Sequence, residues 1–320
     1  MNNPTVVVCG TINMDTFVSV KNFPVAGETT IGKQGLQSLG GKGANQATAC
    51  ARLGVRTVLL SAVGSDPQGD AVLSELADHG VNVEYVKTTS QPTGQAFIMN
   101  DDSGENVIIV VSGANELVSP ASYRSVVNRL REQGSVPVVL AQGELTPEHS
   151  AELPVLVKDS DSRLVLNLGP VTTRDPDLLA VADPLIVNAG EARDVLDVPR
   201  ETTLNEVLDK LSALSKSVVV TLGGEGAVVL DHGISATEAV YIPALRLDGV
   251  VDTTGAGDAF AGTVAAAMAQ GESLVDACRL GNAAGALATQ RQGAAASYAT
   301  GEQIRALAEN SELPAQSVEQ

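Results

Sequence analysis

The sequence is poor in aromatic side chains. Its 320 residues include four Phe, four Tyr and no Trp, whereas hydrophobic residues together make up 44% of the chain. This scarcity excludes a core built around large rings, so the interior must consist of Ala, Val, Leu and Ile. A chain of this length can bury one large core or two ordinary domains.

Basic side chains are also scarce. Lys and Arg number 20 against 38 Asp and Glu, which gives a formal net charge of −18. A field of this sign repels nucleic acid and anionic membranes, so neither is an expected partner. An anionic small molecule would be repelled as well. Its binding would require local N–H groups and a divalent ion.

Cysteine is limited to Cys9, Cys50 and Cys278, and neither a Cys-x-x-Cys motif nor a histidine cluster accompanies them. Three widely spaced cysteines indicate buried thiols in a reducing compartment rather than a disulfide framework or a zinc site. No apolar run approaches the ~20 residues that span a bilayer. The first residues also lack the basic region of a signal peptide. We therefore expect a cytoplasmic protein.

Short apolar runs alternate with helical patterns along the chain. The runs lie at 6–8, 58–63, 136–141, 164–168, 185–187 and 218–222, and clear helical patterns at 70–79 and 122–133. This alternation predicts a parallel sheet with helices on both faces. Candidate ligand residues follow the ends of several runs, namely Asn13, Glu144, Asn188 and Gly223. Ligands bind at that edge of an open α/β sheet.

Two segments, 15–39 and 93–112, read instead as extended strands with few helical features. Within the second, residues 107–111 are all apolar. A strand with one solvated face alternates apolar and polar residues, and this run does not. It is therefore either buried within one chain or covered by a partner.

A short turn of glycine and alanine ends in a carboxylate near the C-terminal third. Residues 252–260 read Asp-Thr-Thr-Gly-Ala-Gly-Asp-Ala-Phe, and an alanine-rich helical stretch follows. The first N–H groups of a helix and its dipole favour an anion. Asp258 stands beside this site, where it could act as base for an attacking hydroxyl. The alternative is a tight strand-to-helix turn with an acidic first-turn residue.

A second glycine cluster lies at residues 39–47, Leu-Gly-Gly-Lys-Gly-Ala-Asn-Gln-Ala, and opens another helix of small residues. Glycine lets a ligand approach the main chain closely, and Lys42 and Asn45 add a charge and an amide. The cluster is not a P-loop, because Gly43 follows Lys42, and no third glycine completes a dinucleotide fingerprint. A turn that packs a helix tightly onto a sheet is the alternative.

The two clusters resemble, in order, the two signatures of the ribokinase-like (PfkB) carbohydrate kinases. Further matching segments lie at 10–15, 24–29, 112–120, 188–191 and 221–226. The resemblance implies an α/β fold, a ribokinase-like three-layer sandwich with a mostly parallel central sheet and a small β-sheet lid. It implies a kinase domain of residues 1–310 with lid segments 15–39 and 93–112 inserted, followed by a frayed tail, 311–320.

The same resemblance assigns the site. The sugar would contact Asn13, Asp15, Gly41, Lys42, Gly43, Asn45, Glu144 and Asp258. Asp258 would be the base, and the moving phosphoryl group would lie on the N–H groups of Gly255, Ala256 and Gly257. The nucleotide would contact Asn188, Thr221, Leu222, Gly223, Gly224, Glu225, Gly226, Gly257 and Asn282. Magnesium would be held, through water, by Asn188 and Glu191. Potassium would lie near Asp252, Thr254, Ala288, Arg291, Gly293 and Ser297.

The implied activity is transfer of the γ-phosphate of ATP to the 5-hydroxyl of D-ribose. Deoxyribose, fructose and adenosine are alternative acceptors, and a non-catalytic sugar-binding regulator is an alternative of another class. The base and the glycines are both retained, which favours an enzyme. Dimers of the family imply a homodimer through the outer face of the lid. Two departures are Glu225, an acid where relatives often carry a base, and Asn-Leu-Gly-Pro at 167–170 in place of Asn-Pro-Ala-Pro.

Overall fold

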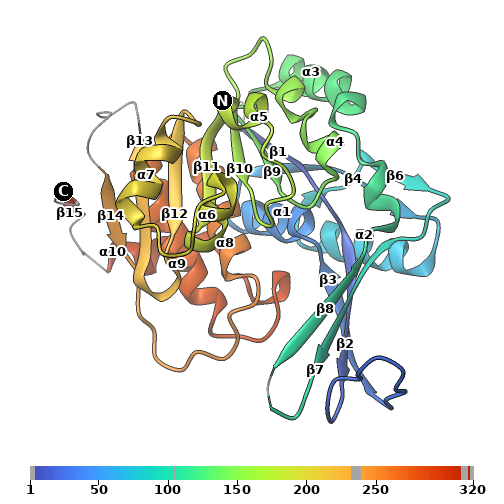
Figure 1. The fold of residues 1–320 in the computed structure, drawn as a ribbon. Coiled ribbons are helices and arrows are strands. Elements are labelled where there is room, and N and C mark those ends of the chain that lie inside the picture. Colours follow the sequence, from blue (N-terminus) through green and yellow to red (C-terminus); the bar gives the residue numbers. More distant parts are fainter. Residues whose placement is uncertain (1–3, 104, 232–238, 311–315, 318–320) are drawn as a thin grey trace.

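The computed structural model describes residues 4–103, 105–231, 239–310 and 316–317. Figure 1 shows a body in which a central sheet lies between helices, and a small sheet that projects away from it. The central sheet is built, in chain order, from β1 (Thr5–Cys9), β4 (Arg56–Gly64), β5 (Val81–Asn82), β6 (Val86–Thr89), β9 (Val138–Gln142), β10 (Arg163–Asn167), β11 (Ala182–Asn188), β12 (Ser217–Thr221), β13 (Gly226–Asp231), β14 (Val240–Pro243) and β15 (Gln316–Ser317).

The strands run in the order β15-β14-β13-β12-β11-β10-β9-β1-β4-β5, with β6 paired to β4. Neighbours from β12 to β5 are parallel, whereas β13, β14 and β15 pair antiparallel. Parallel strands covered on both faces read as continuous apolar runs, which is why the runs in the sequence marked these strands. The prediction of a mostly parallel sheet is confirmed.

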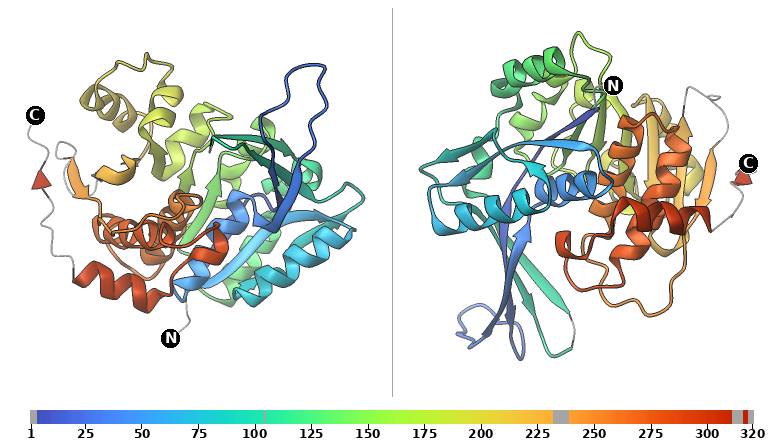
Figure 2. Two further views of the ribbon diagram at one scale, coloured as in Figure 1. Left: turned by 90° about the horizontal axis from the view of Figure 1, so that it is seen from below. Right: turned by 180° about the vertical axis from the view of Figure 1, so that it is seen from behind.

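Helices cover both faces of this sheet, as the two views in Figure 2 show. One face is covered by α1 (Lys42–Arg52), α2 (Pro67–Asp78), α8 (Ala256–Ala269), α9 (Leu274–Ala288) and α10 (Gly301–Glu309). The other is covered by α3 (Arg124–Gln133), α4 (Pro147–Ser150), α5 (Pro176–Val181), α6 (Ala189–Leu196) and α7 (Leu204–Ser212). Short 3-10 turns lie at Gly113–Leu117, Pro120–Tyr123, Leu153–Leu156, Gly223–Glu225 and Ala295–Ser297.

Each face of the sheet has its own hydrophobic core, because successive side chains of a strand point to opposite faces. On β1, Val6 and Val8 pack among the helices of the first face, whereas Val7 and Cys9 pack among those of the second. The first core is rich in alanine from α8 and α9. Small side chains let these helices lie close to one another and to α1, in keeping with the scarcity of large rings.

The small sheet, here called the lid, consists of β2 (Asn13–Ser19), β3 (Lys33–Gly40), β7 (Gly94–Asn100) and β8 (Asn106–Val111), in the order β3-β2-β7-β8. It extends from the carboxyl end of β1 (Figure 1). The side chains of residues 107–111 on the edge strand β8 are 40% to 56% exposed. Burial of this strand within a single chain is therefore excluded. Of the tail, 311–315 and 318–320 lie outside the described residues, and Gln316–Ser317 pairs with β14.

Candidate active site

The two glycine clusters meet where α1 lies against the start of α8. Lys42, Asn45 and Gln46 share one face of α1, because residues three and four apart on a helix are neighbours. All three contact Asp258: Asn45 Nδ2 donates to Oδ2 at 3.0 Å and Gln46 Nε2 to Oδ1 at 2.9 Å. Lys42 Nζ lies 3.7 Å from Oδ1. The predicted base thus stands among three side chains from the other cluster.

Asp258 is 5% exposed and lies in the first turn of α8. The N-cap residue Gly255 has φ 76°, a conformation that favours glycine. Of the three predicted phosphoryl contacts, the N–H of Ala256 donates to the Thr253 carbonyl at 3.2 Å. Gly257 faces open space, since no atom lies within 4 Å of where its Cβ would stand. An anion can therefore approach the helix start beside the carboxylate.

Glu144 is held at the start of α1. Its Oε2 accepts hydrogen bonds from Thr11 Oγ1 and, at 2.9 Å, from the backbone N–H of Lys42. The chain approaches itself closely here: a Cβ on Gly43 would stand 2.4 Å from the N of Thr11. The glycine therefore allows α1 to start directly beside the end of β1, which brings Glu144 to Lys42.

Two buried acceptors near Asp258 find no donor within the described part of the chain, namely Asp15 Oδ1 and Asn45 Oδ1. Buried polar atoms are normally hydrogen-bonded, so each such exception needs a ligand or water to account for it. Asn13 differs, because its Oδ1 accepts from Asn115 Nδ2 at 2.8 Å. Asn115 also pairs with both the N–H and the carbonyl of Ile12, at 3.0 Å each. Asn13 thus keeps its own Nδ2 for another partner.

Charge is concentrated at this site. Asp258 raises the pKa of Lys42, an effect that burial opposes and that Glu144 and Glu191 reinforce. Burial, together with the charges of Glu144 and Asp258, raises the pKa of Asp15 to about 7. Glu144 and Asp258 thus act on both Lys42 and Asp15, and Glu191 acts on Lys42 as well. The candidate site therefore combines several carboxylates with one cation.

The carboxyl ends of four neighbouring strands line this edge of the sheet. Gln142 of β9 pairs with Asn167 of β10, and Asn188 of β11 pairs with Thr221 of β12. This register places the predicted sugar contacts and the predicted nucleotide contacts along one edge of the sheet. Gln46 bonds both Asn167 and Asp258, and so connects Asp258 to the same edge. Ligand sites of open α/β sheets lie at this edge.

The predicted nucleotide loop lies directly after β12. Gly223 and Gly224 have no atom within 4 Å of where a Cβ would stand, so the loop is open to a ligand. The side chain of Glu225 is exposed. Asn282 of α9 donates through Nδ2 to the carbonyls of Ile242 and Pro243 at 3.2 and 3.1 Å. Its donors are thereby used to hold β14, next to the loop.

Asn188 and Glu191 form a capping box at the start of α6. Asn188 Oδ1 accepts from the N–H groups of Gly190 and Glu191 at 2.8 Å, and Glu191 Oε2 accepts from the N–H of Asn188 at 2.8 Å. Burial raises the pKa of Glu191, against the effect of the Asn188 N–H and of Lys42. No cluster of three or more His, Cys, Asp or Glu side chains that could hold a metal occurs in the described ranges. One carboxylate still suits Mg²⁺, which keeps several waters and takes further ligands from phosphates.

The residues predicted for potassium fall in two loops that Asp252 joins. Its Oδ1 accepts from the N–H of Thr254 and its Oδ2 from the N–H of Gly293, both at 2.9 Å. Burial raises the pKa of Asp252, but these two N–H groups outweigh it and the pKa is lowered. Ser297 and Ala288 are buried, whereas Arg291 is exposed. The two loops thus lie together, at the start of α8.

Four residues of the site were missed by reading the sequence. Gln46, Gln142 and Asn167 form a chain of amides behind Asp258, and Thr11 binds Glu144. Gln46 stands inside the second glycine cluster, one position after Asn45, and helical spacing from Lys42 was a signal that could have found it. Asn167, the first residue of the segment that departs from Asn-Pro-Ala-Pro, accepts from Gln46 at 2.8 Å.

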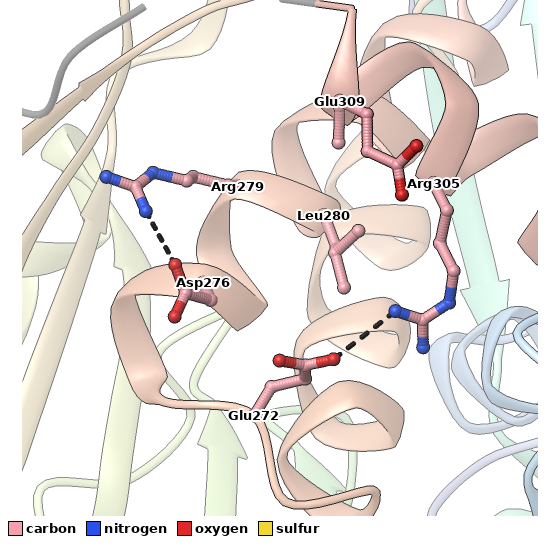
Figure 3. Close-up of a pocket in the computed structure, with 7 residues that line it drawn as sticks. Glu272, Asp276, Arg279, Leu280, Arg305 and Glu309 are labelled. Atoms are coloured by element: carbon pink, nitrogen blue, oxygen red, sulfur yellow. Dashed lines mark hydrogen bonds and ion pairs between the residues drawn. The ribbon is translucent and has the colours of Figure 1, made fainter. Parts of the chain in front are cut away.

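A separate pocket of about 230 Å³ lies between α9 and α10 (Figure 3). Four of its charged side chains form two ion pairs, Arg279 with Asp276 at 2.5 Å and Arg305 with Glu272 at 3.3 Å. It contains none of the predicted site residues and is not the candidate active site. No helix in the described part of the chain has the length and apolar character needed to cross a membrane.

Comparison with known proteins agrees with this geometry. The profile described as pfkB family carbohydrate kinase matches residues 3–300. A ribokinase of Arabidopsis thaliana is 34% identical over 298 residues, covering 91% of this chain and 77% of that protein. A ribokinase of Haemophilus influenzae is 33% identical over 308 residues, covering 92% and 95%. The structure of the Arabidopsis thaliana ribokinase complexed with ribose and ATP superposes with a TM-score of 0.85 at 31% identity, covering 97% of this chain and 99% of that one.

Proposed function

Since this chain belongs to the pfkB family of carbohydrate kinases, we propose that it transfers the γ-phosphate of ATP to the 5-hydroxyl of D-ribose, giving D-ribose 5-phosphate. The relatives named ribokinase, and the ribokinase complexed with ribose and ATP, support this choice of acceptor and donor. The α/β sandwich with a projecting lid is the fold that these proteins share with it.

One observation in this chain carries the proposal. The buried oxygens Asp15 Oδ1 and Asn45 Oδ1 lack donors within the described residues. Asn45 bonds Asp258, whose charge also acts on Asp15, and the start of α8 beside Asp258 is open at Gly257. A sugar offers several hydroxyl donors at once and so satisfies such acceptors. An acceptor pocket for hydroxyls next to an anion site is what phosphoryl transfer to a sugar requires. A sugar lacking one of these hydroxyls would leave a buried oxygen unpaired, which penalises its binding.

In this mechanism Asp258 accepts the proton of the 5-hydroxyl as the oxygen forms a bond to the γ-phosphorus. The bond between that phosphorus and the β,γ-bridging oxygen breaks, and ADP leaves with its electron pair. The N–H groups at the start of α8, with Gly257 open to solvent, stabilise the charge on the transferring group. Lys42, 3.7 Å from Asp258, adds a positive charge at the same place.

The nucleotide would lie along the loop at 221–226 and beside Asn188, at the end of the edge away from the lid. Its magnesium ion would be held through water by Asn188 and Glu191. That ion, when bound, neutralises charge on the phosphate oxygens. The net charge of −18 makes this local neutralisation necessary, because the field of the whole protein repels ATP.

A panel of acceptors tests the proposal. The purified chain is assayed for ADP formation from ATP and Mg²⁺ with D-ribose, 2-deoxyribose, fructose and adenosine. We expect the highest kcat/KM with D-ribose, and a product whose phosphorus couples to the protons of carbon 5 by NMR. A higher value with another acceptor would reassign the substrate within the same chemistry. Sugar binding without ADP formation from any acceptor would favour a non-catalytic regulator.

We also propose a monovalent cation site between residues 252–254 and 288–297. Asp252 carries a negative charge where these loops meet, and backbone carbonyls of the loops can supply further oxygens. A cation here would order the turn that begins α8 and so act on the anion site at a distance. Activity is expected to be higher in KCl than in NaCl of the same ionic strength. Equal activity in both salts would count against the site.

We further propose that the chain forms a homodimer through the lid. The edge strand β8 exposes five consecutive apolar side chains, residues 107–111, and Ile31 and Leu36 in or beside β3 are 93% and 69% exposed. Apolar surface of this extent on an edge strand is otherwise a liability for aggregation. Sedimentation at micromolar concentration should give the mass of two chains. A monomer at that concentration would refute the dimer.

A further inference from the structure

Gln46 lies at the centre of a buried set of amides behind Asp258. Its side chain is fully buried, at 0% exposure. Nε2 donates to Asp258 Oδ1 at 2.9 Å and to Asn167 Oδ1 at 2.8 Å, and Oε1 accepts from Gln142 Nε2 at 2.9 Å. Both amide protons and the amide oxygen are therefore used, so the group cannot turn without losing several hydrogen bonds.

The orientation of this amide is set by its neighbours. Asn167 donates through Nδ2 to the carbonyl of Ile186 at 3.1 Å, which turns its oxygen toward Gln46. Gln142 presents its own NH₂ group from the end of β9. An acceptor on one side and a donor on the other leave Gln46 a single arrangement, in which a proton points at Asp258. The sheet thereby directs a hydrogen bond at the base.

The crossing of α1 and α8 brings Gln46 to this point. A Cβ on Gly262 would stand 2.5 Å from the carbonyl oxygen of Gln46 and 2.6 Å from Cβ of Ala49. Cys50 Sγ contacts the carbonyl of Gly262 at 3.1 Å. Gly262 lies one turn after Asp258 on α8. The glycine that allows close contact between the helices therefore also brings Asp258 next to Gln46.

We propose that Gln46 is a positioning residue for phosphoryl transfer, and this inference rests on the proposed kinase function. It holds Oδ1 of Asp258, while Asn45 holds Oδ2, so that the plane of the carboxylate is fixed relative to the sugar pocket. Without Gln46, Lys42 Nζ at 3.7 Å would be the remaining donor near Oδ1 among the described residues, and we expect the carboxylate to turn toward that ammonium. Small displacements of a reacting group lower the rate steeply, on the order of 10²-fold for about 1 Å.

The test is a double-mutant cycle with Gln46→Met, which keeps the length of the side chain and removes its donors. We expect kcat to fall ~10-fold or more while KM for ribose changes less than ~3-fold. In an Asp258→Asn background the same substitution should leave the residual kcat unchanged, because the group on which Gln46 acts is gone. A role in packing alone would lower kcat by the same factor in both backgrounds, and that result overturns the inference.

Two further variants keep the test decisive. Thr48→Val is the matched control. Thr48 is buried on the same helix and, within the described part of the chain, its hydroxyl bonds only the carbonyl of Ala44, at 2.9 Å, so the kcat of this variant should stay near that of the wild type. Gln142→Met removes the donor that orients Gln46 without touching Asp258, and serves if Gln46→Met does not fold. It should show a smaller loss of kcat that also vanishes with Asp258→Asn. A wild type inactive on every acceptor refutes the proposed function itself, whereas equal losses in both backgrounds of an active enzyme refute the role of Gln46 alone.

Discussion

Replacing Asp15 with asparagine should change the pH dependence of stability. The free energy of unfolding of Asp15→Asn, relative to that of the wild type, should increase as the pH rises. Folding raises the pKa of this carboxyl from 3.8 to about 7, because the side chain is buried and faces Glu144 and Asp258. A carboxyl whose pKa is raised on folding stabilises the native state only while it is protonated. Its contribution is complete below pH 3.8 and is lost as the pH rises to about 7.

The size of the effect follows from the two pKa values. Between pH 5 and pH 8 the folded state loses the advantage of about two pKa units, and each unit is worth about 1.4 kcal/mol. The free energy of unfolding of the wild type should therefore fall by about 2–3 kcal/mol more than that of Asp15→Asn over this range. All other groups titrate in both proteins, so the difference isolates Asp15 and its influence on its neighbours.

Urea unfolding of both proteins at pH 5 and pH 8, without sugar, measures this difference. The exposed lid residue Asp102 provides the matched control, and Asp102→Asn should follow the wild type at both pH values. Parallel pH dependence of the wild type and Asp15→Asn would refute the reasoning. It would mean that Asp15 ionises in the empty pocket as freely as it does in the unfolded chain.

The remaining predictions concern two glycines and the electrostatic effect of the net charge. Gly257→Ala should leave stability unchanged or raise it by up to ~1 kcal/mol, because the added Cβ meets open space. The same methyl group should lower kcat ~10-fold or more by obstructing the phosphoryl group. Full activity of this variant would place the phosphoryl group elsewhere. Gly43→Ala should cost about 1–3 kcal/mol in urea unfolding, or prevent folding, since its Cβ meets backbone atoms of Thr11 and Gly10 at 2.4 and 2.5 Å; unchanged stability would contradict the close approach. Raising ionic strength with choline chloride to ~0.15 M should lower KM for ATP by screening the charge of −18; a rise in KM would show that local attraction dominates.

The fold could be read from the sequence because its strongest signals are local. Apolar runs mark β1, β4, β9, β10, β11 and β12 to within a few residues, since buried parallel strands admit little else. Helix boundaries were predicted less accurately: the helical stretch expected after the turn at 252–260 begins at Ala256, inside that turn. Chain termini and edges carry weaker signals, and the pairing of β15 with β14 was not foreseen.

Reading the sequence predicted the charged and glycine residues of the candidate site but not the amides behind them. Asp258 and Lys42 stand out in sequence because charge in a glycine-rich turn has few structural uses. Gln142 and Asn167 lie at the ends of apolar strands, where a single polar residue is ordinary, and only the register of β9 and β10 brings them to Gln46. Relations across 96 and 121 residues depend on the folded topology and leave no local pattern.

In the proposed mechanism the two glycine turns meet so that a sugar hydroxyl would find both a base and an anion site. Ribose-dependent formation of ADP by the wild type and by Asp258→Asn, compared side by side with their urea midpoints, tests this most directly. We expect turnover by the wild type and a loss of ~10²-fold or more in a variant that remains folded. Turnover by Asp258→Asn close to that of the wild type would contradict the account.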